Sequence, residues 1–160
     1  MLIVGCGCRG QALATALLER GYAVRGTTRS ADRVAAIEAT GAEAALADPD
    51  RLGTVMEALV AVSAICWLMG SATGEAVADL HGPRLRTLLE RLVDTPVRGV
   101  VYEAAGTVDG SLLAAGAQAV RDAERTWRMP AEIADTDPAD REAWLAALAA
   151  AVGRLLGAID

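Results

Sequence analysis

The chain has 160 residues and a formal net charge of −6, so it is long enough for one domain with a core of its own. Its acidity argues against binding to nucleic acid or to an anionic membrane surface, because both attract basic proteins. No run of about 20 apolar residues is present, and no basic segment precedes a long apolar stretch at the N-terminus. We therefore expect no bilayer-spanning helix, no signal peptide and a cytoplasmic location.

The three cysteines and the single histidine do not have the spacing of a metal site. Cys6 and Cys8 lie two residues apart, but neither Cys66 nor His81 is near them in the sequence. Three cysteines also do not form a disulfide framework. We expect no bound metal.

Short apolar runs alternate with longer helical ones along the chain, which is typical of βαβ units. Strands are expected at residues 2–4, 23–28, 43–46, 62–69, 97–102 and 131–133. Helices are expected at residues 11–20, 31–40, 83–93, 112–127 and 138–156, with one more that follows a capping stretch at 48–50 and ends at 59. This alternation predicts an α/β fold, a doubly wound parallel sheet in the order 3-2-1-4-5-6 with helices on both faces.

Local signals support several of these boundaries. Gly21 and Gly41 are suited to end helices, because glycine readily adopts the left-handed conformation that follows a helix. Ser30 is a candidate N-cap, and Pro83 suits the first turn of a helix. Residues 70–82 have no regular pattern and are expected to form a loop.

The segment Gly5–Gly10 reads GCGCRG and follows the first expected strand directly. A G-x-G-x-x-G pattern between a strand and a helix indicates a loop that binds a dinucleotide. Gly5 allows the tight turn, Gly7 lets the backbone approach a pyrophosphate, and Gly10 lets the helix pack closely. The helix N-terminus offers free N–H groups to the phosphates. The alternative is a glycine turn without a ligand.

The remaining loop residues, Cys6, Cys8 and Arg9, are counted with the cofactor-binding residues because of their place in the motif. We interpret the two cysteines as small residues that tolerate crowding, and not as reactive or metal-binding groups.

The end of the second expected strand indicates which dinucleotide binds. An NAD site has a carboxylate there, about 20 residues after the loop, on the 2′-hydroxyl of the adenosine ribose. This chain reads GTTRS at residues 26–30, without an acid. Thr28 and Ser30 offer hydroxyls, and Arg29 offers a planar guanidinium for a 2′-phosphate. Arg33 lies one turn further on. The pattern favours NADP over NAD, and its alternative is that the two arginines belong to a solvated helix start.

Asp48 follows the third expected strand, where folds of this kind meet the adenine. Its carboxylate suits a hydrogen bond from the adenine amino group, and it equally suits an N-cap ahead of Pro49. Both interpretations stay open at this point.

Several segments resemble the short-chain dehydrogenase/reductase superfamily, in its extended and atypical branch of NmrA-like and epimerase-like proteins. The opening LIVGCGCRGQALATALLERGYAVRGTTRS is similar to the start of that branch. The segment AEAALADPDRL resembles its third strand with the adenine-side acid, and VRGVVYEAAGTV resembles its fifth strand. The resemblance covers about the first two-thirds of the chain clearly, and it implies a Rossmann fold that binds NAD(P).

The catalytic residues of the family are not matched. Catalytic members carry a Tyr-x-x-x-Lys pair on the helix after the fifth strand, but residues 112–127 include no tyrosine and the chain has no lysine. Ala104 and Ala105 stand where the family's fifth strand ends in hydroxyl residues. The substrate lobe of extended members is also missing. We expect residues 1–160 to form one minimal NAD(P)-binding Rossmann domain without a separate substrate domain.

The nicotinamide end of such a site lies over the carboxyl ends of strands four and five. Met69 ends the fourth expected strand and Gly70 follows it, and both are expected to contact the cofactor. Tyr102 and Glu103 are candidate proton donors or acceptors, and strand alternation lets only one of them face the crevice. The alternatives are a packed strand aromatic for Tyr102 and, for Glu103, a carboxylate that binds a backbone donor or faces water.

Three residues of the loop at 70–82 have side chains suited to a site. His81 is an attractive acid by its chemistry, but its polar surroundings in the sequence predict a solvated side chain. Ser71 and Thr73 would contact a cofactor ribose or phosphate if the loop folds inward.

The three tryptophans, Trp67, Trp127 and Trp144, are expected in the core or at an interface and not as platforms for a substrate. The last helix carries one apolar stripe, and its alanines cover much of the rest. Such a helix fits either burial in the core or the interface of a homodimer. The stripe consists of Trp144, Leu148, Val152, Leu155 and Ile159.

Two functions from different classes agree with these patterns. The first is an NADP-dependent oxidoreductase that acts on a small carbonyl substrate. The second is a non-catalytic NADP(H)-binding module, either a redox sensor or a subunit whose partner completes a site. The missing Tyr/Lys pair favours the second function, and the glycine loop serves both.

Overall fold

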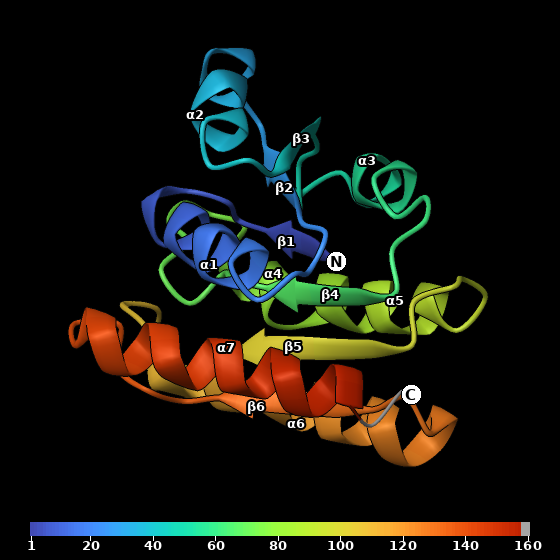
Figure 1. Ribbon diagram of the computed structural model, residues 1–160. Coiled ribbons are helices and arrows are strands. Elements are labelled where there is room, and N and C mark those ends of the chain that lie inside the picture. Colours follow the sequence, from blue (N-terminus) through green and yellow to red (C-terminus); the bar gives the residue numbers. More distant parts are fainter. Residues whose placement is uncertain (158–160) are drawn as a thin grey trace.

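The computed structural model describes residues 1–157, whose centre is a single parallel sheet (Figure 1). The strands lie in the order β3-β2-β1-β4-β5-β6, and every neighbouring pair is parallel. This confirms the predicted α/β fold and the predicted strand order. The strands are β1 Leu2–Val4, β2 Arg25–Thr28, β3 Glu43–Leu46, β4 Ala64–Trp67, β5 Gly99–Glu103 and β6 Ala131–Ala134.

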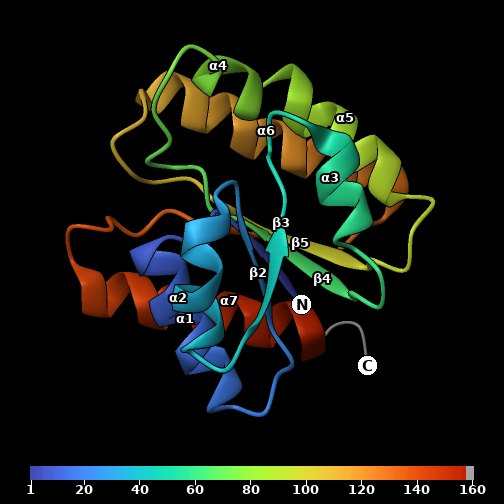
Figure 2. The same cartoon turned by 90° about the horizontal axis from the view of Figure 1, so that it is seen from above.

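The helices cover both faces of the sheet. Helices α3, α4, α5 and α6 lie on one face, and α1, α2 and α7 lie on the other (Figure 2). The helices are α1 Cys8–Leu18, α2 Val34–Glu38, α3 Leu52–Glu57, α4 Val77–Leu80, α5 Pro83–Leu92, α6 Gly110–Trp127 and α7 Arg141–Gly157.

Each face of the sheet has its own apolar core, because successive side chains of a strand point to opposite faces. Trp67 and Tyr102 belong to the core beneath α5 and α6. Cys66 and Val101, their neighbours along the same strands, belong to the core beneath α1 and α7. The face that a side chain of β5 occupies therefore decides which helices it meets.

The first helix begins earlier than the sequence predicts. Helix α1 starts at Cys8 and not at residue 11, so Arg9 and Gly10 are already helical. Gly7 is the N-cap with an extended backbone, at φ −75° and ψ −161°. The glycine motif is thus part loop and part helix, and its side chains project from a fixed helical turn.

Two other stretches differ from the expectation. Residues 31–40 divide into a 3-10 turn at Ala31–Arg33 and the short helix α2. The Ser30 side chain makes no capping bond there and donates instead to Asp32. Residues 70–82, expected to be a loop throughout, contain the single helical turn α4.

The apolar stripe of α7 is buried within the chain itself. Trp144, Leu148, Val152 and Leu155 are each at most 1% exposed, which confirms core burial, while Ile159 lies outside the described residues. Trp127, by contrast, is 40% exposed and is not a core residue. The homodimer stays a prediction. Within residues 1–157, no helix combines the length and the apolar character needed to cross a membrane.

Candidate functional site

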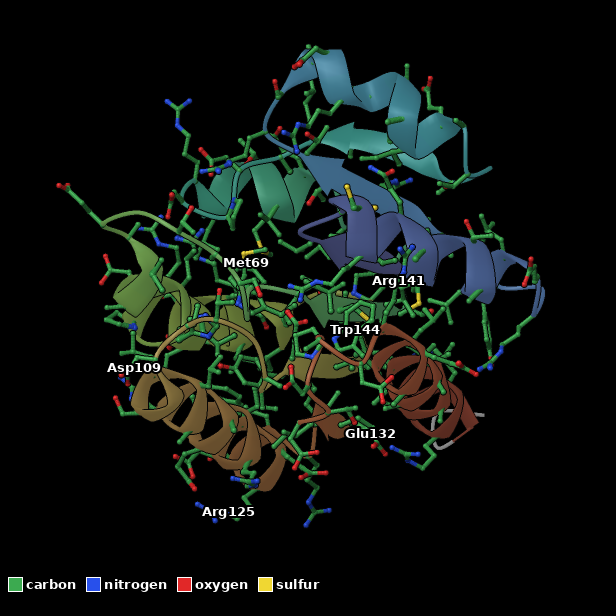
Figure 3. All side chains as sticks on the ribbon, turned by 90° about the vertical axis from the view of Figure 1, so that its left-hand side faces the viewer. Met69, Asp109, Arg125, Glu132, Arg141 and Trp144 are labelled. Carbon is green, nitrogen blue, oxygen red and sulfur yellow. The ribbon has the colours of Figure 1, made fainter. Side chains whose placement is uncertain are left out.

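A cleft of about 410 Å³ opens at the edge of the sheet where the strands end. Figure 3 looks onto this edge and labels Met69 and Trp144, which both line the cleft. One end is bordered by residues that follow β2, and we call it the β2 end. The other is bordered by Glu103, the last residue of β5, and we call it the β5 end. Strands β1 and β4 lie between β2 and β5.

The glycine loop lines the cleft between the two ends. Each of its three glycines has different surroundings. Gly5 has a φ of +90°, and a Cβ there would lie 2.5 Å from the Leu68 carbonyl oxygen. A Cβ on Gly10 would lie 2.8 Å from the Gly5 carbonyl oxygen. A Cβ on Gly7 would meet no protein atom within 4 Å. Two glycines therefore permit close backbone packing, and the third leaves free space beside the cleft.

The start of α1 is suited to an anion. Its N-cap, Gly7, has no side chain to accept the first N–H groups, and its first turn carries no acid. N–H groups in the first turn of a helix lack intrahelical partners and carry the positive end of the helix dipole. Because Cys8 and Arg9 of this turn line the cleft, these groups face the place where a phosphate would bind.

The two loop cysteines differ in their surroundings. Cys6 is 4% exposed, and a Cβ on Gly26 would lie only 2.5 Å from its Sγ, so the thiol fills the space between the loop and β2. Burial raises the pKa of Cys6 to about 11. Cys8 is exposed and lines the cleft. In residues 1–157 no three His, Cys, Asp or Glu side chains gather as a metal site requires.

At the β2 end, Thr28, Arg29 and Arg33 line the cleft. Both arginines are exposed, and within the described part of the chain neither forms a salt bridge. Ser30 does not line the cleft. Its backbone N–H donates to Thr28 Oγ1 over 3.2 Å, which closes a tight turn around Arg29. Three of the four residues predicted here therefore border one space.

Asp48 does not line the cleft. Its Oδ1 accepts from the backbone N–H of Asp50 over 3.0 Å, and α3 begins only at Leu52 with no side-chain cap. The acid that lines the cleft after β3 is Asp50. The predicted helix cap is therefore wrong, because Asp48 closes this local turn instead, and Pro49 favours the turn because its ring restricts the backbone. The adenine contact stays a prediction.

Tyr102 points away from the cleft, toward α6. Its hydroxyl lies 2.6 Å from His81 Nδ1 and 3.3 Å from the Leu113 carbonyl oxygen. Gly116 makes room for it, since a Cβ there would lie 2.0 Å from the hydroxyl. Burial raises the pKa of Tyr102, with a smaller contribution from the charge of Glu103. Tyr102 is therefore a packed aromatic residue of the strand whose hydroxyl has partners inside the protein, and it is not a group of the cleft.

His81 is buried, so the prediction of a solvated side chain is wrong. Its Nε2 lies 3.1 Å from the Met69 carbonyl oxygen, which can only accept a hydrogen bond. Burial lowers the pKa of His81, and the Met69 bond opposes this. We assign a neutral ring in which Nε2–H donates to Met69 and Nδ1 accepts from Tyr102. His81 can be buried because Tyr102 and the Met69 carbonyl oxygen form hydrogen bonds with its two ring nitrogens.

Glu103 faces the cleft but is only 1% exposed. Its Oε2 accepts from the Gly70 N–H over 2.8 Å, and its Oε1 accepts from Trp144 Nε1–H over 2.9 Å. An Arg9 nitrogen lies 3.9 Å from Oε1. Burial raises the pKa of Glu103, while these three neighbours oppose the rise. The carboxylate therefore ties together the loop after β4 and helix α7.

Of the four residues after β4 that were predicted to contact the cofactor, three line the cleft and one does not. Met69, Ser71 and Thr73 line the cleft, but Gly70 does not. A Cβ on Gly70 would lie 2.0 Å from the Ala105 carbonyl oxygen, so this glycine lets the loops after β4 and β5 pack together. The Ser71 Oγ is buried and has no hydrogen-bond partner in the described chain. This hydroxyl is therefore available to form a hydrogen bond with a ligand in the cleft.

Trp144 is the site residue that the sequence pattern did not reveal. It is 1% exposed and part of the core, yet it also lines the cleft, and the Arg9 guanidinium lies 5.5 Å from its ring centre. The two residues are far apart in the sequence, and an apolar stripe predicts only burial. No local signal marks such a contact.

No family model and no curated protein matches this sequence. Solved structures do. A putative NAD-dependent epimerase/dehydratase from Bacillus halodurans superposes with a TM-score of 0.70 at 18% identity, over 86% of this chain and 69% of that one. The triphenylmethane reductase of a Citrobacter sp. gives 0.67 at 16% identity, over 84% of this chain and 48% of that one. The UDP-glucuronic acid 4-epimerase of Bacillus cereus gives 0.65 at 15% identity, over 86% and 59%.

The chain has a Rossmann fold. This confirms the fold that the resemblance to extended short-chain dehydrogenases implied. The matched region makes up between 48% and 69% of the length of these three proteins, so the likeness concerns their fold and not their whole activity.

Proposed function

We propose that the chain binds NADP(H) in the cleft at the strand ends. The observation that carries this proposal is the placement of the glycine loop Gly5–Gly10 and of Arg29 and Arg33 around one space. The loop suits a pyrophosphate, and the arginines suit a second, separate phosphate. The UDP-glucuronic acid 4-epimerase structure is described as a complex with NAD, and one structure of the triphenylmethane reductase as a complex with NADP(H).

Three features of the cleft fit a dinucleotide. The side of Gly7 that a Cβ would occupy is open, so backbone and phosphate can approach each other there. The first turn of α1 has no acid and no side-chain cap. The Ser71 Oγ is buried, has no partner in the described chain and would gain one from a ligand in the cleft.

The preference for NADP follows from charge at the β2 end. An acid that accepts from a ribose 2′-hydroxyl would repel a 2′-phosphate, and the segment 26–30 has none. Arg29 can form a charge-assisted hydrogen bond to that phosphate, which is stronger than a bond between neutral groups. Arg33 borders the same space and adds a second positive charge.

We further propose that the protein is an oxidoreductase acting on a small carbonyl compound. A bound nicotinamide supplies or accepts a hydride. For a reduction, the carbonyl carbon takes that hydride and the carbonyl oxygen takes one proton. Tyr102 is on the wrong face to give it, and both oxygens of Glu103 already accept hydrogen bonds. Water admitted to the cleft is then the proton source, and Glu103 has the role of holding the β5 end in shape.

The non-catalytic module is the second candidate, and the same observation favours it. Among the described residues, neither Tyr102 nor Glu103 presents a free acid or base to the cleft. A redox sensor needs only a difference in affinity between the oxidised and reduced dinucleotide, and a subunit would receive the missing group from its partner.

The test is a titration of the purified protein with NADPH, followed by the fluorescence of the cofactor, in parallel with NADH. NADPH should bind at least tenfold more tightly than NADH. Mixing the complex with a panel of small carbonyl compounds then separates the two candidates. Oxidation of NADPH supports the oxidoreductase, and binding without turnover supports the module. Absence of binding by either nucleotide would overturn the proposed function.

A further inference from the structure

We infer that Arg9 is the receptor for a carboxylate group of the substrate, so that the carbonyl compound is a small oxo acid. This inference rests on the proposed function, because it names the substrate class of the same cleft. It starts from the side chains at the β5 end, where Arg9, Glu103 and Trp144 meet.

The position of Arg9 is the first step. Its guanidinium lies beside Glu103, the last residue of β5, and not beside Arg29, which follows β2. Two strands separate β2 from β5, which amounts to roughly 14 Å across the sheet. Arg9 is therefore at the opposite end from the arginines proposed for the 2′-phosphate. In a nicotinamide-binding Rossmann fold, the reacting molecule enters over the ends of the fourth and fifth strands.

The second step is that Arg9 is held in place while its donors remain available. The guanidinium lies over the ring of Trp144, 5.5 Å from the ring centre, and 3.9 Å from a Glu103 oxygen. The latter distance is too long for a hydrogen bond. In residues 1–157 the guanidinium makes no hydrogen bond, and the Arg9 side chain is 33% exposed. Its planar fork is thus oriented and partly desolvated, and it forms an ion pair with Glu103 without donating a hydrogen bond to it.

The third step concerns the nearby negative charge. The charge of Glu103 opposes an incoming carboxylate, and the positive charge of Arg9, 3.9 Å away, offsets it. Both Glu103 oxygens already accept hydrogen bonds, from the Gly70 N–H and from Trp144 Nε1–H. Because these two donors serve the Glu103 oxygens, the Arg9 N–H groups are left to donate to another acceptor. The arginine fork matches a carboxylate in shape, because two parallel N–H groups meet two oxygens.

A second donor supports the same class of ligand. The Ser71 Oγ is buried, has no partner in the described chain and lines the cleft. It follows Gly70, whose N–H holds Glu103, so Ser71 belongs to the same end. A hydroxyl here can donate to a carbonyl oxygen while Arg9 holds the carboxylate. A molecule that carries both a carbonyl and a carboxylate is an oxo acid, and pyruvate, a 2-oxo acid, is a small example.

The pyrophosphate of the dinucleotide is the other anion that suits Arg9, and the test separates the two sources. The probe is pyruvate, titrated calorimetrically into the protein saturated with NADPH and into the protein alone. Pyruvamide, in which a neutral amide replaces the carboxylate, is the matched ligand. Arg9→Met keeps the apolar stem over Trp144 but removes the charge, and Arg9→Lys keeps the charge but removes the fork. Arg20→Met, at an exposed arginine outside the cleft, is the control.

The expected result is that pyruvate binds at least tenfold more tightly than pyruvamide. Arg9→Met should weaken pyruvate at least tenfold and Arg9→Lys by a smaller factor, while NADPH affinity changes less than threefold. Equal binding of pyruvate and pyruvamide would overturn the inference. So would a tenfold loss of NADPH affinity in Arg9→Met, because Arg9 would then serve the pyrophosphate.

The failure of the proposed function has a different signature. If NADPH does not bind but pyruvate binds the protein alone and loses affinity in Arg9→Met, the anion receptor stands and the dinucleotide proposal falls. If Arg9→Met does not fold, Arg9→Lys decides the question, because its loss must be specific to pyruvate.

Discussion

The two ends of the cleft are built in different ways. The β2 end consists of the exposed Arg29 and Arg33 after β2, next to the glycine loop, and all of these residues lie within the first 33 of the chain. The β5 end combines Arg9 from α1, Gly70 after β4, Glu103 from β5 and Trp144 from α7. The side chains of the β2 end point to solvent, whereas those of the β5 end are tied to one another.

This difference assigns different roles to residues that look alike in the sequence. A change at the β2 end should alter the affinity for a ligand and leave the fold intact, since its side chains hold no other element. A change at the β5 end should alter the shape of the cleft together with its chemistry, because Glu103 joins β5 to the loop after β4 and to α7 through two buried hydrogen bonds and pairs with Arg9 of α1. The following predictions test this contrast.

The largest expected effect is that of Gly7→Val on cofactor binding. A Cβ at this position meets no protein atom within 4 Å, so the variant should fold normally while its methyl groups occupy the phosphate space. We expect at least a hundredfold loss of NADPH affinity, about 2.7 kcal/mol, measured by fluorescence titration. Gly53→Ala is the control, because a Cβ there is also free of contacts but lies outside the cleft. Equal affinities for Gly7→Val and wild type would show that the loop does not hold the pyrophosphate.

Arg29→Ala should weaken NADPH and leave NADH unaffected. A lost charge-assisted hydrogen bond costs about 1.5–3 kcal/mol, which is roughly a ten- to hundredfold loss of affinity. The thermal stability should not change, because Arg29 is exposed and forms no salt bridge within the described chain. Parallel titrations with both nucleotides provide the measurement. A matching loss for NADH would mean that Arg29 does not contact the 2′-phosphate.

Gly116→Ala should lower the free energy of unfolding with little effect on NADPH affinity. The new methyl group would clash with the Tyr102 hydroxyl in the core beneath α6, away from the residues that line the cleft. Overpacking of this kind costs about 1–3 kcal/mol, measured by urea unfolding. In the Tyr102→Phe background the cost should be smaller, because the closest atom is gone. Gly110→Ala, where a Cβ meets nothing, is the control on the same helix. Unchanged stability of Gly116→Ala would contradict this packing.

The smallest expected effect is a pH dependence from His81. Burial lowers its pKa below the ordinary value of 6.5, so below pH 6.5 the unfolded chain binds a proton that the folded chain resists. The stabilising contribution is therefore complete above pH 6.5 and is lost as the pH falls through the lowered value. The slope cannot exceed about 1.4 kcal/mol per pH unit for one proton.

The measurement is urea unfolding of wild type and His81→Gln between pH 5 and pH 8. Glu103 acts in the opposite sense, since its pKa is raised above 4.5 and its contribution is lost as the pH rises. Both proteins carry Glu103, so its contribution cancels in the difference. The difference should shrink as the pH falls below 6.5. Two parallel curves would show that the pKa of His81 is not lowered.

The two ends also differ in what could be predicted from the sequence. The glycine motif identifies the strand-loop-helix unit, because its spacing directly after a strand is typical of a dinucleotide-binding loop. The pair Tyr102 and Glu103 shows a limit of prediction from local sequence patterns. Alternation predicts that one of them faces the crevice, but which one depends on the helices that cover each face.

The sequence by itself determined the sheet, its strand order and the glycine loop, because the periodicity of apolar residues and the spacing of glycines are visible over short distances along the chain. Only the tertiary structure decided the state of the polar groups at and behind the β5 end. His81 is buried because Tyr102 offers it a partner 21 residues away. The Glu103 Oε1 accepts a hydrogen bond from Trp144, which lies 41 residues away in the sequence. A buried polar group is stable only when its partner is in place, and the packing of α7 and α4 onto the sheet supplies those partners.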